Sequence, residues 1–176
     1  MGISFRLSAV ESRVAVFTGI EVAALGLWLR SLVRGLRGAA AAFLGGGLVV
    51  EHILAYNVRN KRRLLDLAGL PILGILIFSA LEFIIWAVGA EGVSRGLEFL
   101  PLYLAFFFAF LVKHRIAANV NAGRNLLDFS VFEGKLVTAT VFEALFGAYW
   151  LVNPSAGTLG LFGVANFVEH KLLNEI

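Results

Sequence analysis

The chain has 176 residues and a net charge of +3, with 59% hydrophobic residues and only 15% charged ones. Soluble domains have roughly 45–50% apolar and about 25% charged residues, so this chain has more apolar surface than a soluble domain of its length can bury. Cysteine is absent, which excludes disulfides and thiolate metal ligands. No nucleic-acid-binding motif accompanies the basic residues, so the composition indicates a lipid bilayer and no nucleic acid as partner.

Six apolar segments follow one another along the chain. A helix needs about 20 mostly apolar residues to cross the hydrocarbon core of a bilayer. The six segments are Val14–Leu32, Gly38–Tyr56, Leu67–Val88, Phe99–Val112 with an extension to Ala118, Leu136–Val152 and Gly157–Leu172. Polar or Gly- and Pro-containing turns separate them. They predict an all-α integral membrane protein, a multipass bundle of six transmembrane helices that forms one domain over residues 1–176.

The distribution of Lys and Arg predicts the orientation in the membrane. Eleven of the fifteen lie near the two termini or between the second and third and the fourth and fifth segments, and four lie at the opposite ends. Cytoplasmic segments are enriched in Lys and Arg, so both termini are predicted to be cytoplasmic. Arg30, Arg34 and Arg37 favour the reverse orientation for the first hairpin alone.

A repeated pattern divides the chain into three hairpins. The odd segments contain [Ser/Thr]-x-x-Glu at intervals of 61 residues, and the even segments end in Val-[Glu/Lys]-His followed by Asn. The copies are Thr18 to Glu21, Ser79 to Glu82 and Thr140 to Glu143, and then Glu51-His52 to Asn57, Lys113-His114 to Asn119 and Glu169-His170 to Asn174. The pattern predicts three two-helix repeats, approximately residues 7–63, 64–124 and 125–176, related by a pseudo-threefold axis as in some transporters.

The repeated Glu and His residues are predicted to form one layer inside the membrane. A charged residue at the centre of a transmembrane helix costs about 2.5–3.5 kcal/mol, and such residues usually face the bundle interior and mark functional paths. Each Glu should therefore be protonated, paired or bound to a cation. At 1.5 Å per residue, Glu and His of one hairpin reach similar depths. The predicted pairs are Glu21 with His52, Glu143 with His170 and, less closely, Glu82 with His114.

Ten further polar residues are predicted to support this layer. They are Thr18, Ser79, Thr140, Glu51, Lys113, Glu169, Asn57, Asn119, Asn166 and Asn174. The three hydroxyl residues lie three positions before each Glu and share its helix face. Consecutive helical residues point about 100° apart, so Glu51, Lys113 and Glu169 should not point with the adjacent His. Extension to the membrane interface is the alternative for these three.

Several functions are compatible with such a layer. Carboxylate and imidazole suit a divalent transition metal, namely Zn, Fe, Mn or Cu, and the same groups also relay protons, so the leading hypothesis is a transporter or channel-like protein with a cation site. A membrane enzyme for a lipid or isoprenoid substrate and a haem protein are alternatives. Threefold repetition argues against catalysis, which needs distinct residues in distinct roles. A structural or accessory subunit and a homo-oligomer also remain open.

Overall fold

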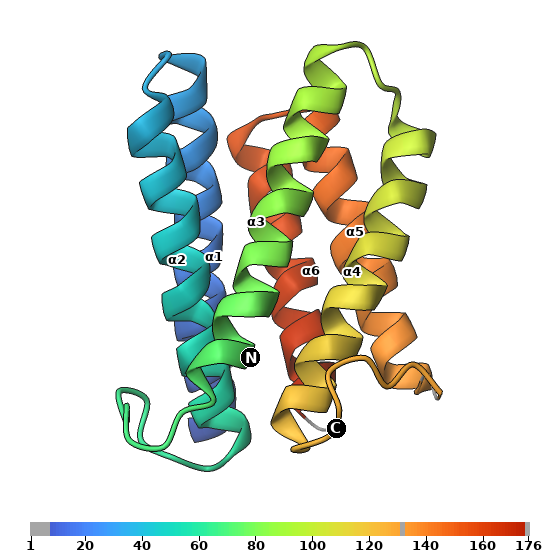
Figure 1. Ribbon diagram of the computed structural model, residues 1–176. Coiled ribbons are helices and arrows are strands. Elements are labelled where there is room, and N and C mark those ends of the chain that lie inside the picture. The colour runs from blue at the N-terminus through green and yellow to red at the C-terminus, as the bar shows by residue number, and fades with distance from the viewer. Residues whose placement is uncertain (1–7, 131–132, 175–176) are drawn as a thin grey trace, which may run out of the picture.

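The computed structural model describes residues 8–130 and 133–174, and every described element is helical. The helices are α1 (Ala9–Val33), α2 (Arg37–Arg59), α3 (Ile72–Ser94), α4 (Phe99–Asn121), α5 (Gly134–Val152) and α6 (Ala156–Asn174). They stand side by side, with the turns inside the three hairpins at one end and the α2–α3 and α4–α5 loops at the other (Figure 1). We call these the turn end and the loop end. The all-helical prediction is confirmed.

Each predicted segment corresponds to one helix, and one clear difference in the bounds is at the start of α3. The sequence predicted a start at Leu67, whereas the helix begins at Ile72. The Asp66 carboxylate accepts the backbone N–H of Ala68 at 3.1 Å, and Gly69 has φ +62°, so the chain turns here. Pro71 follows and precedes the first helical residue. The helix therefore starts only after this turn.

Local signals also fix the first hairpin. Ser8 and Glu11 form a reciprocal capping box, in which each backbone N–H donates to the other side chain. Gly35 adopts φ +72° and donates its N–H to the Leu32 carbonyl, which ends α1 and turns the chain into α2. Only glycine adopts this left-handed backbone readily, so the position requires it.

The helices α1 to α5 are long and apolar enough to cross a membrane, within the described residues. The helix α6 has 19 residues and carries Asn166, Glu169 and His170, all of them buried. The outer surface of the bundle exposes large apolar side chains such as Leu27, Phe108 and Val164. Buried polar groups with an apolar exterior reverse the distribution in soluble proteins, so this is a multipass integral membrane fold.

The six helices close into a ring. Each helix packs against its neighbours in the chain, and α6 packs against α1. The Lys171 ammonium on α6 also lies 2.7 Å from a Glu11 carboxylate oxygen on α1. The first and last hairpins are therefore neighbours, although residues 60–133 lie between them in the sequence.

An aromatic layer fills the interior between the polar centre and the turn end. Trp86 is at its middle and is fully buried. Its ring meets those of Phe106, Phe110, Trp150 and Phe162 at centroid distances of 5.3, 5.7, 5.8 and 5.4 Å, all edge-on. Such edge-to-face pairs are favourable beyond their apolar burial. We refer to these five residues as the aromatic layer.

Gly47 marks the closest approach of α1 and α2, and it gives a stability prediction. A Cβ atom added there would lie 2.2 Å from the Cβ of Ala24, whereas one added at Gly46 meets nothing within 4 Å. We expect Gly47→Ala to lower the free energy of unfolding by about 1–3 kcal/mol through overpacking. Gly46→Ala should be neutral or stabilise by up to about 1 kcal/mol, because alanine favours the helix. Thermal unfolding in detergent measures both, and equal effects would contradict the close approach.

Candidate functional site

Three acids from the odd helices meet at the centre of the bundle. Glu21, Glu82 and Glu143 lie near the midpoints of α1, α3 and α5, and each is 1% exposed. Each contributes a carboxylate oxygen, and the three oxygens lie within 4.8 Å of one another. Three carboxylates at this spacing repel one another unless positive charge lies between them.

The three His residues connect successive hairpins through hydroxyl groups. His52 Nδ1 lies 2.7 Å from Ser79 Oγ, which joins α2 to α3. His114 Nδ1 lies 2.8 Å from Thr140 Oγ1 and joins α4 to α5. His170 Nδ1 lies 2.9 Å from Thr18 Oγ1, so the last hairpin connects back to the first. The contacts therefore follow the ring of helices.

The other nitrogen of each ring faces the acid on the same neighbouring helix. The Nε2 atoms lie 3.1 Å from Glu82 for His52, 2.8 Å from Glu143 for His114 and 3.7 Å from Glu21 for His170. We predicted that each His pairs with the Glu of its own hairpin. In the structure each His instead pairs with the Glu of the next hairpin. Depth fixes the height of a side chain but not its rotation about the helix axis. The hydroxyl one turn before each Glu binds the ring and sets that rotation.

The residues before the His residues point inward. Glu51, Lys113 and Glu169 are all buried, so their extension to the membrane interface was wrong. The prediction that neighbours diverge was also wrong, because His52 Nε2 lies 3.2 Å from Glu51 and His170 Nε2 lies 3.2 Å from Glu169. The Cβ atoms diverge by about 100°, but these side chains are long enough to converge near the bundle axis.

Lys113 lies between two of the central acids. Its Nζ is 2.8 Å from Glu82 Oε2 and 3.4 Å from Glu143 Oε1, and it lies 5.4 Å from the centroid of the Phe110 ring. The indole N–H of Trp86 donates to the other Glu82 oxygen at 3.3 Å. Among the three central acids, Glu82 is therefore the one whose two carboxylate oxygens both accept hydrogen bonds.

The hydrogen bonds of Thr140 define the state of His114. The Thr140 hydroxyl donates to the Leu136 carbonyl at 2.8 Å, so it must accept from His114 Nδ1. In the neutral ring, Nε2 then carries a lone pair. This lone pair faces Glu143 Oε2 at 2.8 Å and Glu169 Oε1 at 3.2 Å. Three lone-pair groups facing one another need either a metal ion between them or a proton on the imidazole or on one of the carboxyl groups.

Other carboxylate oxygens at the centre of the bundle also have no hydrogen-bond partner. Among the described residues, the buried carboxylate oxygens that accept no hydrogen bond are Glu21 Oε1, Glu51 Oε1, Glu143 Oε2 and both oxygens of Glu169. Buried polar atoms nearly always have a partner, so these five oxygens are groups that could hold a cation or carry a proton.

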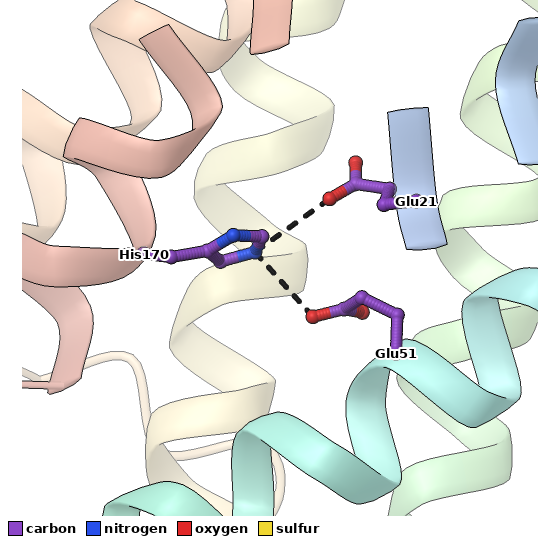
Figure 2. Close-up of side chains that lie close together, drawn as sticks. All are labelled: Glu21, Glu51 and His170. Carbon is purple, nitrogen blue, oxygen red and sulfur yellow. Dashed lines mark ion pairs between the residues drawn. The ribbon is translucent and has the colours of Figure 1, made fainter. Parts of the chain in front are cut away.

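One part of this cluster brings together the first, second and last helices. Glu21 of α1, Glu51 of α2 and His170 of α6 point toward one another (Figure 2). His170 Nε2 lies 3.7 Å from Glu21 and 3.4 Å from Glu51. The Asn166 side chain donates to Glu21 Oε2, the same oxygen that faces His170, and thereby holds this carboxylate in place. Buried Glu and His groups of this kind could hold a metal ion.

A cavity of about 60 Å³ adjoins the cluster on the side of the loop end. Glu51, His114 and Glu169 line its inner part, whereas Arg59 and Leu173, near the loop ends of α2 and α6, line its outer part. A water molecule needs about 10–15 Å³ of such space, so the cavity has room for several waters or a hydrated ion. The aromatic layer lies on the opposite side of the cluster.

Two of the predicted supporting residues have a different role. The Asn57 amide donates to the carbonyls of Leu64 and Asp66, both at 2.9 Å. Asn119 binds Leu126 and Asp128 in the same way, at 3.1 and 2.9 Å. Both Asn residues thus hold the loops at the loop end and not the central cluster. The spacing Asn-Val to Leu-Leu-Asp occurs in both loops and was the sequence signal for this role. The side chain of Asn174 lies outside the described residues.

The two loop acids are held in their charged form. Hydrogen bonds from the Ala68 N–H and the Arg62 side chain lower the pKa of Asp66 below its usual value. The Ser130 hydroxyl and N–H lower the pKa of Asp128. Hydrogen bonds to a carboxylate favour its ionised form, so both loops keep a fixed negative charge beside their basic residues.

The Asn119 contacts give a test of this loop. Asn119→Ala leaves the Leu126 carbonyl without its donor and removes one of the two donors to the Asp128 carbonyl, which Arg115 also binds, so we expect the free energy of unfolding to fall by about 1–3 kcal/mol. Hydrogen exchange should also become faster in residues 122–130. Asn60 is exposed and donates only within its own helix end, so Asn60→Ala should change little. Similar exchange in both variants would contradict the assigned role.

No protein-family model, curated protein or solved structure matches the chain.

Proposed function

We propose that the protein is a small multipass membrane transporter or channel-like protein that binds a cation at the central Glu/His cluster. One observation carries the proposal. The facing atoms His114 Nε2, Glu143 Oε2 and Glu169 Oε1 are buried, converge within 4.8 Å and take part in no hydrogen bond. A cation between them supplies the missing partner.

The position of the cavity supports transport. Its lining extends from Arg59 and Leu173 near the loop end to residues of the cluster, so in this proposal an ion enters the centre of the bundle from the loop end. The aromatic layer separates the cluster from the turn end and serves as the closed gate of this state. In this proposal, α6 crosses the membrane with the other five helices, and a pseudo-threefold axis relates the hairpins. The excess of Lys and Arg at the loop end directs the cavity to the cytoplasm.

Flux through proteoliposomes tests the proposal. The purified protein should carry Mn²⁺, Zn²⁺ or protons into vesicles, and Glu143→Gln should abolish this flux while the melting temperature stays within a few degrees. Glu91→Gln is the matched control, because Glu91 is exposed and pairs with Arg95 one turn away. Vesicles that perform like protein-free ones, or a Glu143→Gln variant with normal flux, would refute transport through the cluster.

A membrane enzyme is the second candidate, and the coordination number of the site favours it. His114, Glu143 and Glu169 supply three ligands, and catalytic metal sites typically combine three protein ligands with an open position. Metal binding without flux, together with turnover of a lipid or isoprenoid substrate, would support this candidate over transport.

A further inference from the structure

Three equivalent positions lie around the central cluster. Each position takes a His from one hairpin and two residues from the next hairpin around the ring. These two are the central Glu and the residue that directly precedes the His of that next hairpin. The first position consists of His52, Glu82 and Lys113, the second of His114, Glu143 and Glu169, and the third of His170, Glu21 and Glu51. The composition differs at one point, because the first position has an ammonium group where the other two have a carboxylate.

Lys113 occupies the first position with its own positive charge. Its Nζ lies 2.8 Å from Glu82 Oε2, the same oxygen that lies 3.1 Å from His52 Nε2. A metal ion bound by His52 and Glu82 would need this oxygen and would lie close to the ammonium group. Like charges at this distance repel strongly in a buried site. The first position is thus filled from within the chain.

The second and third positions contain no ammonium group, and some of their carboxylate oxygens accept no hydrogen bond. At the second, all three facing atoms lack a hydrogen-bond partner. At the third, Glu51 Oε1 lies 3.4 Å from His170 Nε2 and accepts no hydrogen bond, whereas Glu21 Oε2 accepts from Asn166 and only Glu21 Oε1 accepts none. Both positions therefore present carboxylate oxygens that accept no hydrogen bond, whereas both Glu82 oxygens of the first position accept one.

Glu169 connects these two positions. Its Oε1 lies 3.2 Å from His114 Nε2 and its Oε2 lies 3.2 Å from His170 Nε2. Neither oxygen accepts a hydrogen bond, and the residue is 1% exposed. A carboxylate with one oxygen directed to each of two sites is the arrangement of a bridging ligand.

We infer that the protein binds two divalent cations as a dinuclear centre with Glu169 as the bridge. The inference rests on the proposed cation site and specifies its occupants. His114 and Glu143 complete one ion, and His170, Glu21 and Glu51 complete the other. Four carboxylates and two imidazoles are also the ligand inventory of di-iron and di-manganese centres in helical bundles.

Charge balance supports two divalent ions. The cluster contains five buried acids, namely Glu21, Glu51, Glu82, Glu143 and Glu169, and Lys113 as its ammonium group. With neutral His rings, four negative charges remain, and two divalent cations neutralise them. Arg115 is also buried, but its guanidinium binds the carbonyl and the carboxylate of Asp128 in the loop. An uncompensated charge is costly in a membrane interior, so this balance favours the dinuclear centre.

The distances between donor atoms are appropriate for such ions. Metal–ligand bonds of about 2.0–2.2 Å place neighbouring ligands about 2.8–3.1 Å apart in octahedral geometry and about 3.3–3.6 Å apart in tetrahedral geometry. The relevant separations here are 2.8 to 3.7 Å. A carboxylate-rich set with one imidazole per ion suits Mn²⁺ or Fe²⁺, and the absence of cysteine leaves no soft ligand.

Metal stoichiometry and electron paramagnetic resonance with Mn²⁺ test the inference. Purified wild-type protein in detergent, stripped with chelator and dialysed against Mn²⁺, should retain two ions per chain with an exchange-coupled spectrum. His114→Gln should retain one ion and lose the coupling. The matched control is His52→Gln, which changes the equivalent residue at the position filled by Lys113 and should keep two coupled ions.

The outcomes separate this inference from the proposed function. Two uncoupled ions, one ion, or loss of an ion in His52→Gln would overturn the dinuclear centre with its bridge. The wild-type spectrum alone decides this, even where a variant fails to fold. Proton flux without bound metal would leave the transport proposal standing and refute the inference. Two coupled ions without any flux would support the inference and refute the transport proposal.

Discussion

Lys113→Met in the chelator-treated protein is expected to lower the free energy of unfolding by about 3–5 kcal/mol. The ammonium group is buried and contacts Glu82 at 2.8 Å and Glu143 at 3.4 Å. Methionine keeps most of the apolar stem but removes the charge. The two acids then remain buried beside one another without compensation, and this penalty, rather than the lost attraction, dominates the effect.

A second substitution separates charge from packing. The double variant Lys113→Met with Glu82→Gln has one uncompensated buried carboxylate fewer than Lys113→Met alone. A large part of the lost free energy of unfolding should therefore return. Arg95→Met is the control for a pair at the surface, since Arg95 and Glu91 are both exposed, and it should cost about 0–1 kcal/mol. Thermal unfolding in detergent with chelator measures all three variants. A Lys113→Met effect as small as the Arg95→Met effect would mean that Lys113 does not neutralise the cluster.

The sequence was sufficient to predict the helices because their signals are local. Apolar length, turn residues and charge-poor segments each depend on neighbouring positions in the chain. The deeply placed Glu residues were also recognisable, since a membrane helix rarely retains an acid without a polar environment. The structure places Glu21, Glu82 and Glu143 together at the centre, with the three His residues around them.

The pairing of these residues was not predictable from depth. His52 binds Ser79 and Glu82 of the next hairpin because α2 packs against both α1 and α3, and sequence alone does not say which side the ring faces. The spacing of Ser79 and Glu82 contains part of the answer. A hydroxyl and a carboxylate one turn apart match the two nitrogens of one imidazole, whichever hairpin supplies it.

Glu51, Lys113 and Glu169 were predicted to support the layer, but their convergence with the adjacent His residues was not predicted, for a related reason. The helical period gives the direction of each Cβ atom but not the position of the side-chain end. These three side chains are long, so their ends meet near the axis of the bundle although their Cβ atoms diverge. Their alternation was nevertheless informative. Lys113 at one of three otherwise acidic positions reduces the negative charge of the cluster, which is the asymmetry that the dinuclear centre depends on.

Trp86→Ala is expected to lower the stability of the protein and to increase ion leakage through it. Its ring is fully buried against four aromatic rings, and it lies 2.8 Å from where a Cβ on Gly147 would be. Removal of a buried Trp side chain typically costs about 3–5 kcal/mol, because the surrounding structure fills the cavity only in part. The cavity would also lie directly between the polar cluster and the turn end, so water and protons gain a path past the aromatic layer.

Trp86→Phe distinguishes the seal from the hydrogen bond. Phenylalanine keeps most of the ring contacts but cannot donate to Glu82, to which the indole N–H now donates at 3.3 Å. It should cost less stability than the alanine variant and leave the proton leak at the wild-type rate, whereas Trp86→Ala should dissipate an imposed proton gradient several-fold faster than wild type. Dye-monitored proton leak in proteoliposomes measures this directly. Equally tight vesicles with both variants would mean that the aromatic layer stabilises the bundle but does not close the path through it.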